Sequence, residues 1–380
     1  MSAVFAAVAG GTAAFTAVQL VAVQRQLVAT RAPEPARWPS VAVLRPCEGA
    51  EPAILERFAS AFPDDYPGAV THVVAHGSAL APDVRELLGA HGAVVVESRD
   101  APAGCNRKAF HLCTALAAAP ADAEVIVALD ADVEVAPGLL RALVAAAVAP
   151  GAVASFAPPV QQGAGAASRL GRAAFAGSPH AFVVLAGLSR MLGQPAPMVG
   201  CAVAMRRDAL DAAGGFAPSV RVIGDDLALG EALARRGSIS MAHVPADCRN
   251  PTQRTGSLVA QLARWIRVAV AHGPWRAASY PLVFAPMVLV AAAGALVAAS
   301  QPAFVVTGLA GVYALRVALA WQLRRAVYGA PWECLADPWL ADATWFAATL
   351  AAAWPARTRW AGNTYRIGAG GRLRAAEGAP

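Results

Sequence analysis

The sequence predicts an α/β domain with a mostly parallel sheet, preceded and followed by membrane helices. Short apolar strands alternate with helices between residues 41 and 148, which is typical of βαβ units. Two apolar runs without charged side chains cover residues 1–24 and the 39 residues between Arg276 and Arg316. The hydrophobic content of 57% is high for a soluble chain of 380 residues, and membrane insertion accounts for it.

Charge and cysteine content narrow the function classes. Lys108 is the only lysine among 31 basic residues, and the net charge is +6. Because no basic run is interleaved with aromatic residues, this charge suits anionic lipid headgroups and nucleotide phosphates, and nucleic acid is not an expected partner. The six cysteines form no CxxC pair, so neither a zinc site nor a disulfide framework is indicated.

Residues 1–24 predict an N-terminal transmembrane anchor. The run is long enough for the roughly 20 residues that span a bilayer. Its flanking charges, Arg25, Arg31 and Arg37, follow the run, whereas a cleaved signal peptide carries its charge in front. Arginines on this side place the following domain in the cytoplasm. Residues 25–40, with three prolines, form the predicted linker.

The α/β domain is expected to occupy residues 41–275. Its predicted strands are 41–44, 71–75, 93–97, 125–129, 152–160 and 199–205. Its predicted helices are 52–62, 82–90, 106–119, 137–148, 206–216, 227–236 and 257–272. The apolar segment 172–192 has a helical period, and either lines an acceptor cleft or lies on the membrane. The loops after parallel strands meet at one edge, where such sheets bind nucleotides.

The buried strand predicted at 125–129 ends at two carboxylates, Asp130 and Asp132. Hard oxygen ligands at the C-terminal end of a strand can hold a divalent cation, with substrate phosphates as further ligands. The hypothesis is a metal–diphosphate site that binds Mg²⁺ or Mn²⁺. A solvated turn is the alternative interpretation.

Two further sites in the sequence carry groups that could bind an anion or accept a proton at this edge of the sheet. Lys108 lies at the start of the predicted helix 106–119, where backbone N–H groups and a cation can meet an anion; an ordinary surface lysine is the alternative. Asp225 is expected to cap the predicted helix 227–236, and Asp226 to lie in the first turn of that helix, where the helix dipole keeps a carboxylate ionised. An ionised carboxylate can act as general base for a hydroxyl acceptor.

Gln261, Arg264 and Trp265 share one face of the predicted helix 257–272. Arg264 is suited to bidentate contact with phosphate oxygens. An interfacial helix, anchored at lipid headgroups by Arg and Trp, is the alternative.

The C-terminal third predicts a transmembrane hairpin at 276–325, broken at Gln301-Pro302. Arg316 falls inside its second span, where it either snorkels or contacts a lipid head. Residues 343–355 are too short to span and predict a re-entrant or interfacial helix within 326–380. The C-terminus is then cytoplasmic.

These motifs occur in the order found in membrane-bound family 2-type glycosyltransferases. The chain resembles most closely the ceramide glucosyltransferase branch, which includes hopanoid-associated transferases. The resemblance extends from Val41 to about Leu373 and rests on the stretches VAVLRPCEG, NRK, LDADVEVAP, MVGCAVAMRRDALDAAGGF, IGDDLALGEALARRG, QLARW and DATWFAATLAAAWPARTRWAGNTYRIGAGGRL.

The resemblance implies a GT-A fold in a multi-pass protein of the bacterial inner membrane, with its catalytic domain in the cytoplasm. It implies transfer of a sugar, most closely glucose, from a UDP-sugar to a lipid hydroxyl with inversion. Ceramide is the first acceptor and a hopanoid or other lipid the alternative. The implied site residues are Asp130 and Asp132 for cation and diphosphate, Asp226 as base, Lys108 near the nucleotide, and Gln261, Arg264 and Trp265 around diphosphate and acceptor.

One stretch departs from the family pattern. After the second strand the family has an acid that contacts the nucleotide, but this chain has His76-Gly77-Ser78. His76 or Ser78 is expected to replace those hydrogen bonds. A non-catalytic, lipid-binding membrane scaffold on the same fold is the alternative, which the retained Asp226 and Gln261-x-x-Arg264-Trp265 oppose.

Overall fold

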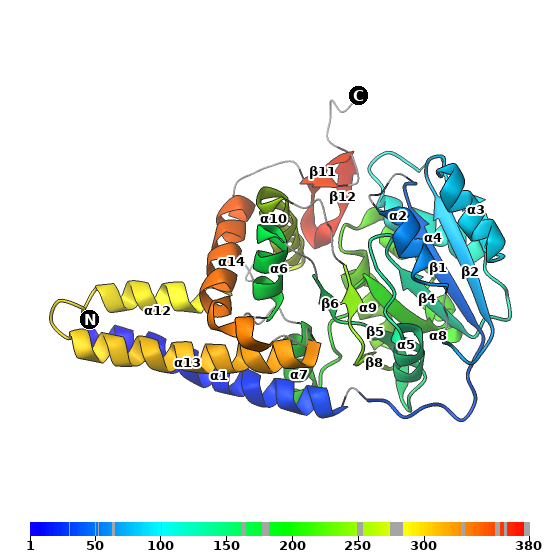
Figure 1. Cartoon of the computed structure of the whole chain (residues 1–380). Coiled ribbons are helices and arrows are strands. Elements are labelled where there is room, and N and C mark those ends of the chain that lie inside the picture. Colours follow the sequence, from blue (N-terminus) through cyan, green and yellow to red (C-terminus); the bar gives the residue numbers. More distant parts are fainter. Residues whose placement is uncertain are drawn as a thin grey trace. The chain divides into compact units, whose positions relative to one another are not determined.

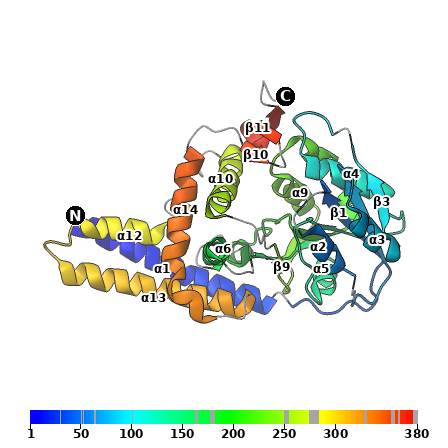
Figure 2. The same ribbon diagram turned by 45° about the horizontal axis from the view of Figure 1, so that its top comes forward.

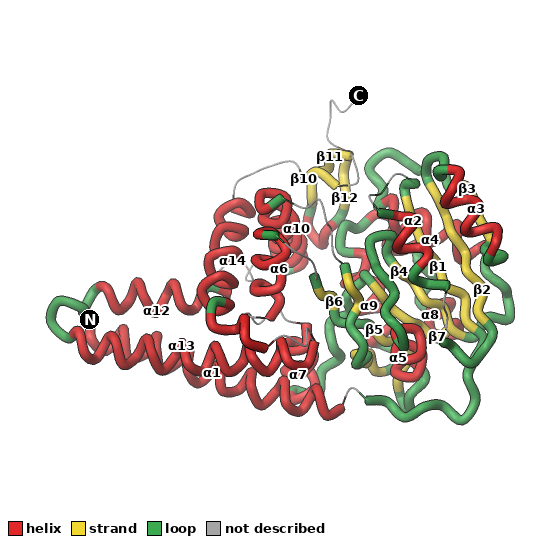
Figure 3. Tube along the Cα trace, in the orientation of Figure 1, coloured by secondary structure: helices red, strands yellow, loops and turns green. Residues whose placement is uncertain are grey.

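The computed structural model describes residues 1–29, 31–49, 51, 53–62, 65–99, 101–161, 165–176, 182–248, 254–273, 284–327, 331–353, 358–360 and 363–375. The chain divides into two compact units. Unit 1 comprises residues 1–28, 160–194 and 253–356, and unit 2 comprises 29–159, 195–252 and 357–380. Figure 3 shows that helices dominate unit 1, whereas unit 2 contains the large sheet.

Unit 2 is built on a seven-stranded sheet (Figure 1). Its strands are β1 (Val41–Cys47), β2 (Val70–His76), β3 (Val94–Glu97), β4 (Val125–Leu129), β5 (Ala152–Phe156), β7 (Ala202–Arg206) and β8 (Ser238–Met241), in the order β3-β2-β1-β4-β7-β5-β8. β1 pairs in parallel with β2 and β4, β2 with β3, and β5 with β8. β7 runs antiparallel to β4 and β5. The predicted mostly parallel α/β sheet is therefore confirmed.

The helices of unit 2 follow the strands as the alternating pattern predicts. They are α2 (Ile54–Ala59), α3 (Pro82–Ala90), α4 (Arg107–Ala118), α5 (Leu139–Ala147), α8 (Arg207–Ala212) and α9 (Asp225–Ala234), with the 3₁₀ helix η1 (Ala217–Arg221) before α9. All of β4 is buried, and the apolar face of α5 packs against it through Leu139 and Leu143. The segment predicted as one strand at 152–160 forms β5 and the short β6 (Pro159–Val160), which pairs with β9 (Ala246–Asp247). Neither β8 nor β9 was predicted.

The strand order places the ligand edge. The connection from β1 leads to β2 on one side, whereas β4 returns to the other side of β1. Loops at the C-terminal ends of β1 and β4 therefore diverge, which leaves the crevice where open α/β sheets bind ligands. Glu48 and Asp130 follow these two strands.

The end of the chain also belongs to unit 2. Three strands, β10 (Thr358–Trp360), β11 (Asn363–Ile367) and β12 (Leu373–Ala375), form an antiparallel sheet, with the 3₁₀ turn η3 (Ala369–Gly371) before β12. The sequence analysis expected only a cytoplasmic tail here, because each strand is too short to show a clear period.

Unit 1 is helical (Figure 2). Its helices are α1 (Ser2–Ala29), α6 (Ala166–Ala176), α7 (Phe182–Met191), α10 (Thr255–His272), α12 (Pro286–Ala295), α13 (Pro302–Val327) and α14 (Asp337–Ala353), with the 3₁₀ turn η2 (Pro331–Leu335) before α14. Among the described helices, α1 and α13 are long and apolar enough to cross a membrane. The first arm of the predicted hairpin is described only as the 10-residue α12, since 274–283 lie outside the described residues, as do 177–181 of the helix predicted at 172–192.

The prediction for Arg316 was wrong. Its side chain is 1% exposed and pairs at 2.7 Å with Asp342, which is fully buried on α14. Asp342 also accepts a hydrogen bond from the backbone N–H of Met287, at the start of α12. A snorkelling arginine would reach water, whereas this one is neutralised inside unit 1 and ties α12, α13 and α14 together.

Candidate active site

Asp130 and Asp132 lie in a turn that directly follows β4. The Asp130 N–H donates to the carbonyl of Cys201 (2.8 Å), and the Val133 N–H returns to the Asp130 carbonyl (3.1 Å). Asp132 points to solvent, whereas Asp130 is partly buried. The predicted pair therefore stands at the C-terminal edge of the sheet.

Arg45, which the sequence analysis missed, supports this turn from β1. Its guanidinium is 2% exposed and donates to the carbonyls of Val133 (2.7 Å) and Arg57 (2.8 Å). Burial lowers its pKa to about 10 even though Cys47 and Asp132 act in the opposite direction, so the side chain stays charged at neutral pH. A single arginine inside the apolar run of β1 was the available signal in the sequence.

Lys108 joins three loops at the same edge. Asn106 caps α4 by accepting a hydrogen bond from the Ala109 N–H (3.1 Å), which places Lys108 in the first turn. The Lys108 Nζ lies 2.6 Å from Asp130 Oδ1 and 3.7 Å from Asp225 Oδ2, and donates to the Gly200 carbonyl (2.8 Å). The ordinary surface lysine considered as the alternative is thus excluded.

The expected N-cap role of Asp225 was wrong. The helix α9 begins at Asp225, so Gly224 is the N-cap residue, and no side chain caps the helix there. The Asp225 carboxylate instead accepts a hydrogen bond from Asn106 Nδ2 (3.2 Å) and faces Lys108. Asp225 therefore belongs to the cluster, a role that the sequence analysis missed.

Asp226 is held by two backbone N–H groups. One carboxylate oxygen accepts from Gly200 (3.1 Å) and the other from its neighbour Leu227 (2.9 Å). Because β7 runs antiparallel to β4, its first residues lie beside the last residues of β4, which brings Gly200 to this edge. A Cβ atom on Gly200 would lie 2.8 Å from Asp226 Cβ and 3.3 Å from Lys108 Nζ, so only glycine fits.

Acidic groups outnumber basic ones in this cluster. Burial raises the pKa of Asp130 to about 7, and Asp132 adds to the rise while Lys108 opposes it. Burial by the surrounding protein also raises the pKa of Asp132, although its carboxylate reaches solvent. The pKa of Lys108 is raised, because burial lowers it but Asp130 and Asp225 together raise it by more. Lys108 is therefore a fixed positive charge.

The pKa of Asp226 corrects the argument from the helix dipole. Burial is the largest influence and raises this pKa, and the adjacent charge of Asp225 raises it further. Lys108 and the N–H groups of Gly200 and Leu227 lower it, but by less in sum. Asp226 is thus more basic than a free aspartate, which brings it nearer to the range that suits a general base.

The loops after β1 and β2 contain a second charged group. His76 Nδ1 donates to the Ser78 carbonyl (2.8 Å), which closes the turn after β2, and the Ser78 hydroxyl donates to the Glu48 carbonyl, which joins this turn to the loop after β1. The Glu48 carboxylate accepts two hydrogen bonds of 2.6 Å from Arg107. A Cβ atom on Gly77 would lie 2.7 Å from Glu48 Oε2. A carboxylate therefore lies at the end of β2, supplied by the loop after β1.

Gln261, Arg264 and Trp265 lie on α10, which belongs to unit 1, whereas the carboxylate cluster belongs to unit 2. Trp265 belongs to an aromatic group, with ring centroids 5.7 Å from Phe175 and 6.3 Å from Phe182. The proximity of this helix to the donor stays a prediction.

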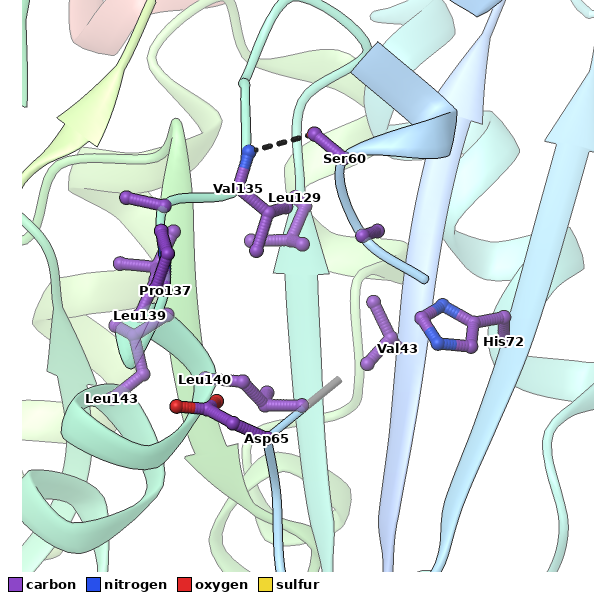
Figure 4. A pocket seen from close by; sticks show the side chains of 12 residues that line it. Val43, Ser60, Asp65, His72, Leu129, Val135, Pro137, Leu139, Leu140 and Leu143 are labelled. Carbon is purple, nitrogen blue, oxygen red and sulfur yellow. Dashed lines mark hydrogen bonds between the residues drawn. The ribbon is translucent and has the colours of Figure 1, made fainter. Parts of the chain in front are cut away.

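A pocket of about 100 Å³ opens beside β1 and β4, between α5 and the side chains of Ser60 and Asp65 (Figure 4). Its wall is mainly apolar, with Asp65 and His72 among the lining residues. None of the candidate site residues lines it, so the pocket is separate from the carboxylate cluster.

The sequence model of the family described as glycosyl transferase family 21 matches residues 3–373. The chain belongs to this family. No curated protein matches it significantly in sequence.

Two solved structures resemble this family 21 chain. A mannosyltransferase from Pyrobaculum calidifontis, solved with GDP-mannose and Mn²⁺, is 21% identical with a TM-score of 0.51, covering 92% of this chain and 99% of that chain. A glucosyl-3-phosphoglycerate synthase from Mycobacterium tuberculosis, solved with Mn²⁺, UDP and its product, is 20% identical with a TM-score of 0.40, covering 61% and 79%. The first of these shares the fold, so the expected GT-A architecture is confirmed.

Proposed function

We propose that this family 21 glycosyltransferase moves a hexose from a UDP-sugar to the hydroxyl of a membrane lipid, with inversion. Glucose and ceramide are the first choices, and a hopanoid or another lipid is the alternative acceptor. One observation carries the proposal: Lys108 pairs with Asp130 and Asp225 beside the backbone-held Asp226. A group for binding a diphosphate and a candidate base thus meet at one sheet edge.

The charge of the cluster supports a divalent cation. Three carboxylates, of Asp130, Asp225 and Asp226, act on the single ammonium of Lys108, and a fourth, of Asp132, acts on Asp130. Burial raises the pKa of Asp130 to about 7, and Asp132 adds to the rise despite Lys108, so a further positive charge beside it would favour the ionised carboxylate. Asp130 and Asp132 would hold Mg²⁺ or Mn²⁺, for which carboxylate oxygens are suitable ligands. When bound, the cation supplies positive charge to the leaving diphosphate.

Side chains of the protein provide the other two functions, which are stabilisation of the leaving diphosphate and removal of the acceptor's proton. Lys108 donates hydrogen bonds to a diphosphate oxygen and stabilises the negative charge that develops as the anomeric C–O bond breaks. Asp226 accepts the proton of the lipid hydroxyl as its oxygen forms the new bond to the anomeric carbon. This single displacement inverts the anomeric centre. Gln261, Arg264 and Trp265 are proposed to border diphosphate and acceptor.

Glu48 and Arg107 are proposed to take over the nucleotide contact that the family makes through an acid after β2. Their paired carboxylate and guanidinium are each about one-third exposed, so both retain free hydrogen-bonding positions. Uracil presents an N–H donor between two carbonyl acceptors, and an acceptor next to a donor is complementary to that edge. The His76 Nδ1 is used by the Ser78 carbonyl and the Ser78 hydroxyl by the Glu48 carbonyl, so these two residues are proposed to hold the loops that carry Glu48 in shape.

The surface of unit 1 supports a lipid acceptor. Phe5, Val290 and Val305 form a buried core between α1, α12 and α13. Yet the outer faces of the two long helices are also apolar, with Val4, Val18 and Val21 on α1 and Val306 on α13 all more than 40% exposed. A helix that is apolar all round belongs in lipid. We place the protein in the bacterial inner membrane, with unit 2 in the cytoplasm.

The deciding experiment presents purified protein in lipid nanodiscs with UDP-glucose, UDP-galactose or GDP-mannose, with Mn²⁺ or Mg²⁺, and with ceramide or a hopanoid alcohol. Product is identified by mass spectrometry and its anomeric configuration by NMR. Asp226→Asn is expected to abolish transfer while nucleotide binding persists, and full activity of this variant removes Asp226 from the mechanism. Absence of glycolipid from every pair contradicts the proposal and favours the membrane scaffold.

A further inference from the structure

The C-terminal strap, residues 363–375, contacts two of the loops that carry the cluster, those that precede Lys108 and Asp226. Tyr365 on β11 is 2% exposed and its hydroxyl donates to the Cys105 carbonyl (3.1 Å). The Gly371 carbonyl accepts from the Ile223 N–H (3.0 Å), and Arg372 forms an antiparallel bridge with Val222. The strap therefore bonds to the chain just before Lys108 and just before Asp226.

These two loops are also bonded to each other, through Asn106. Its N–H donates to the Val220 carbonyl (2.7 Å), and its side-chain amide donates to the Val222 carbonyl (2.9 Å). The same amide group contacts the Asp225 carboxylate at 3.2 Å. Asn106 is 0% exposed, so this connection excludes water. The strap thus contacts two loops that are hydrogen-bonded to each other.

The shape of the strap depends on a left-handed turn. Gly370 and Gly371 have φ angles of 65° and 72°, which residues with a Cβ atom rarely adopt. The turn is closed by the Gly368 N–H, which donates to the Arg372 carbonyl (2.8 Å). This geometry presents the Gly371 carbonyl to Ile223. A side chain at Gly371 would be strained at this φ angle and would therefore weaken the attachment.

We propose that the strap holds the Asp226 loop in its working position and that Tyr365 is a positioning residue for sugar transfer. The inference rests on the proposed function, in which Asp226 is the base. The turn of Asp130 and Asp132 has separate support from Arg45. Lys108 is held in place by Asp130 (2.6 Å) and the Gly200 carbonyl (2.8 Å), so loosening the strap leaves cation and donor binding intact. The consequence is a specific kinetic signature: the rate of the chemical step falls, while donor affinity is kept.

The test compares Tyr365→Phe with Tyr66→Phe. Tyr66 is a matched control, because it is also buried and its hydroxyl also donates to a backbone carbonyl, that of Pro39 (2.7 Å). We expect Tyr365→Phe to lower kcat about fivefold, the loss that one hydrogen bond represents, with the donor KM kept within about twofold. Amide exchange of peptides covering 104–108 and 222–226 should accelerate in this variant and stay at the wild-type rate in Tyr66→Phe.

A second pair of variants addresses the turn. Gly371→Ala is expected to reproduce the loss in kcat and the faster exchange. Gly92→Ala strains an equally left-handed residue (φ 64°) where no atom lies within 4 Å, and should leave both unchanged. Wild-type kcat in Tyr365→Phe, or equal losses in a variant and its control, overturns the proposal. Amide exchange is measured without turnover. If the wild type shows no transferase activity, the proposed function is contradicted, whereas the exchange rates still test the attachment of the strap.

Discussion

The Lys108 ammonium lies 2.6 Å from the Asp130 carboxylate, although the first residue belongs to a helix and the second follows a strand. In this arrangement Lys108 balances part of the charge of a carboxylate that is proposed to bind a cation. We expect Lys108→Gln to weaken binding of UDP in the presence of Mn²⁺ by about tenfold or more, because one charge-assisted hydrogen bond is lost. Isothermal titration calorimetry measures this affinity.

Arg85→Gln is the control for that titration, since the Arg85 side chain on α3 donates from Nε to the carbonyl of nearby Leu80 (3.3 Å). Equal nucleotide affinity in Lys108→Gln and wild type would show that Lys108 does not contact the donor.

The raised pKa of Asp130 makes cation binding depend on pH. With a pKa of about 7, the carboxyl is protonated below neutrality and must lose its proton before it can bind a cation. The affinity for Mn²⁺ should therefore rise as pH increases from 6 to 8, and nearly one proton should be released per ion at pH 6. Titrations in two buffers with different ionisation enthalpies count this proton.

The raised pKa of Asp130 also makes the stability of the cation-free protein depend on pH. The folded state binds the Asp130 proton more tightly than the unfolded state, whose pKa is 3.8. The stabilisation is therefore complete below about pH 4 and is lost as pH rises to about 7. Mn²⁺ affinity that is constant between pH 6 and 8 contradicts this account of Asp130.

Gly200→Ala tests the close approach between β7 and α9. The new Cβ would lie 2.8 Å from Asp226 Cβ, so Asp226 must move by several tenths of an ångström. We expect kcat to fall by about 10- to 100-fold, the effect of misplacing a catalytic group, with little change in the far-UV circular dichroism spectrum. Gly89→Ala on α3, where no atom lies within 4 Å, should retain wild-type kcat. Equal kcat in both variants would refute the argument.

Arg45→Met tests the support of the Asp130–Val133 turn. The variant leaves the buried carbonyls of Val133 and Arg57 without their donor, so the free energy of unfolding should fall by about 2–4 kcal/mol. Denaturant unfolding measures this loss. Cation affinity should fall as well, because the turn that carries the two carboxylates proposed to bind the cation is no longer fixed. Arg206→Met, which removes an exposed ion pair with Asp208, is the control and should change stability by less than about 1 kcal/mol.

The sequence was sufficient for the elements whose periodicity is local. The bounds of α3 and β4 were predicted residue for residue, since a proline at N1 marks the first and two aspartates end the apolar run of the second. The positions of Asp130, Asp226 and Lys108 relative to their own elements followed from the same patterns. Arg316 shows where this reasoning fails: its partner, Asp342, lies on another helix, and no local pattern links the two.

The sequence by itself determined the class of fold, the apolar helices and the set of chemical groups available at the ends of the strands. Only the tertiary structure decided which of these groups meet. The antiparallel course of β7 brings Gly200 to Lys108 and Asp226, and the strap reaches the same loops from the far end of the chain. The physical reason is that periodicity reports how one element is buried, whereas hydrogen bonds and ion pairs depend on strand order and direction.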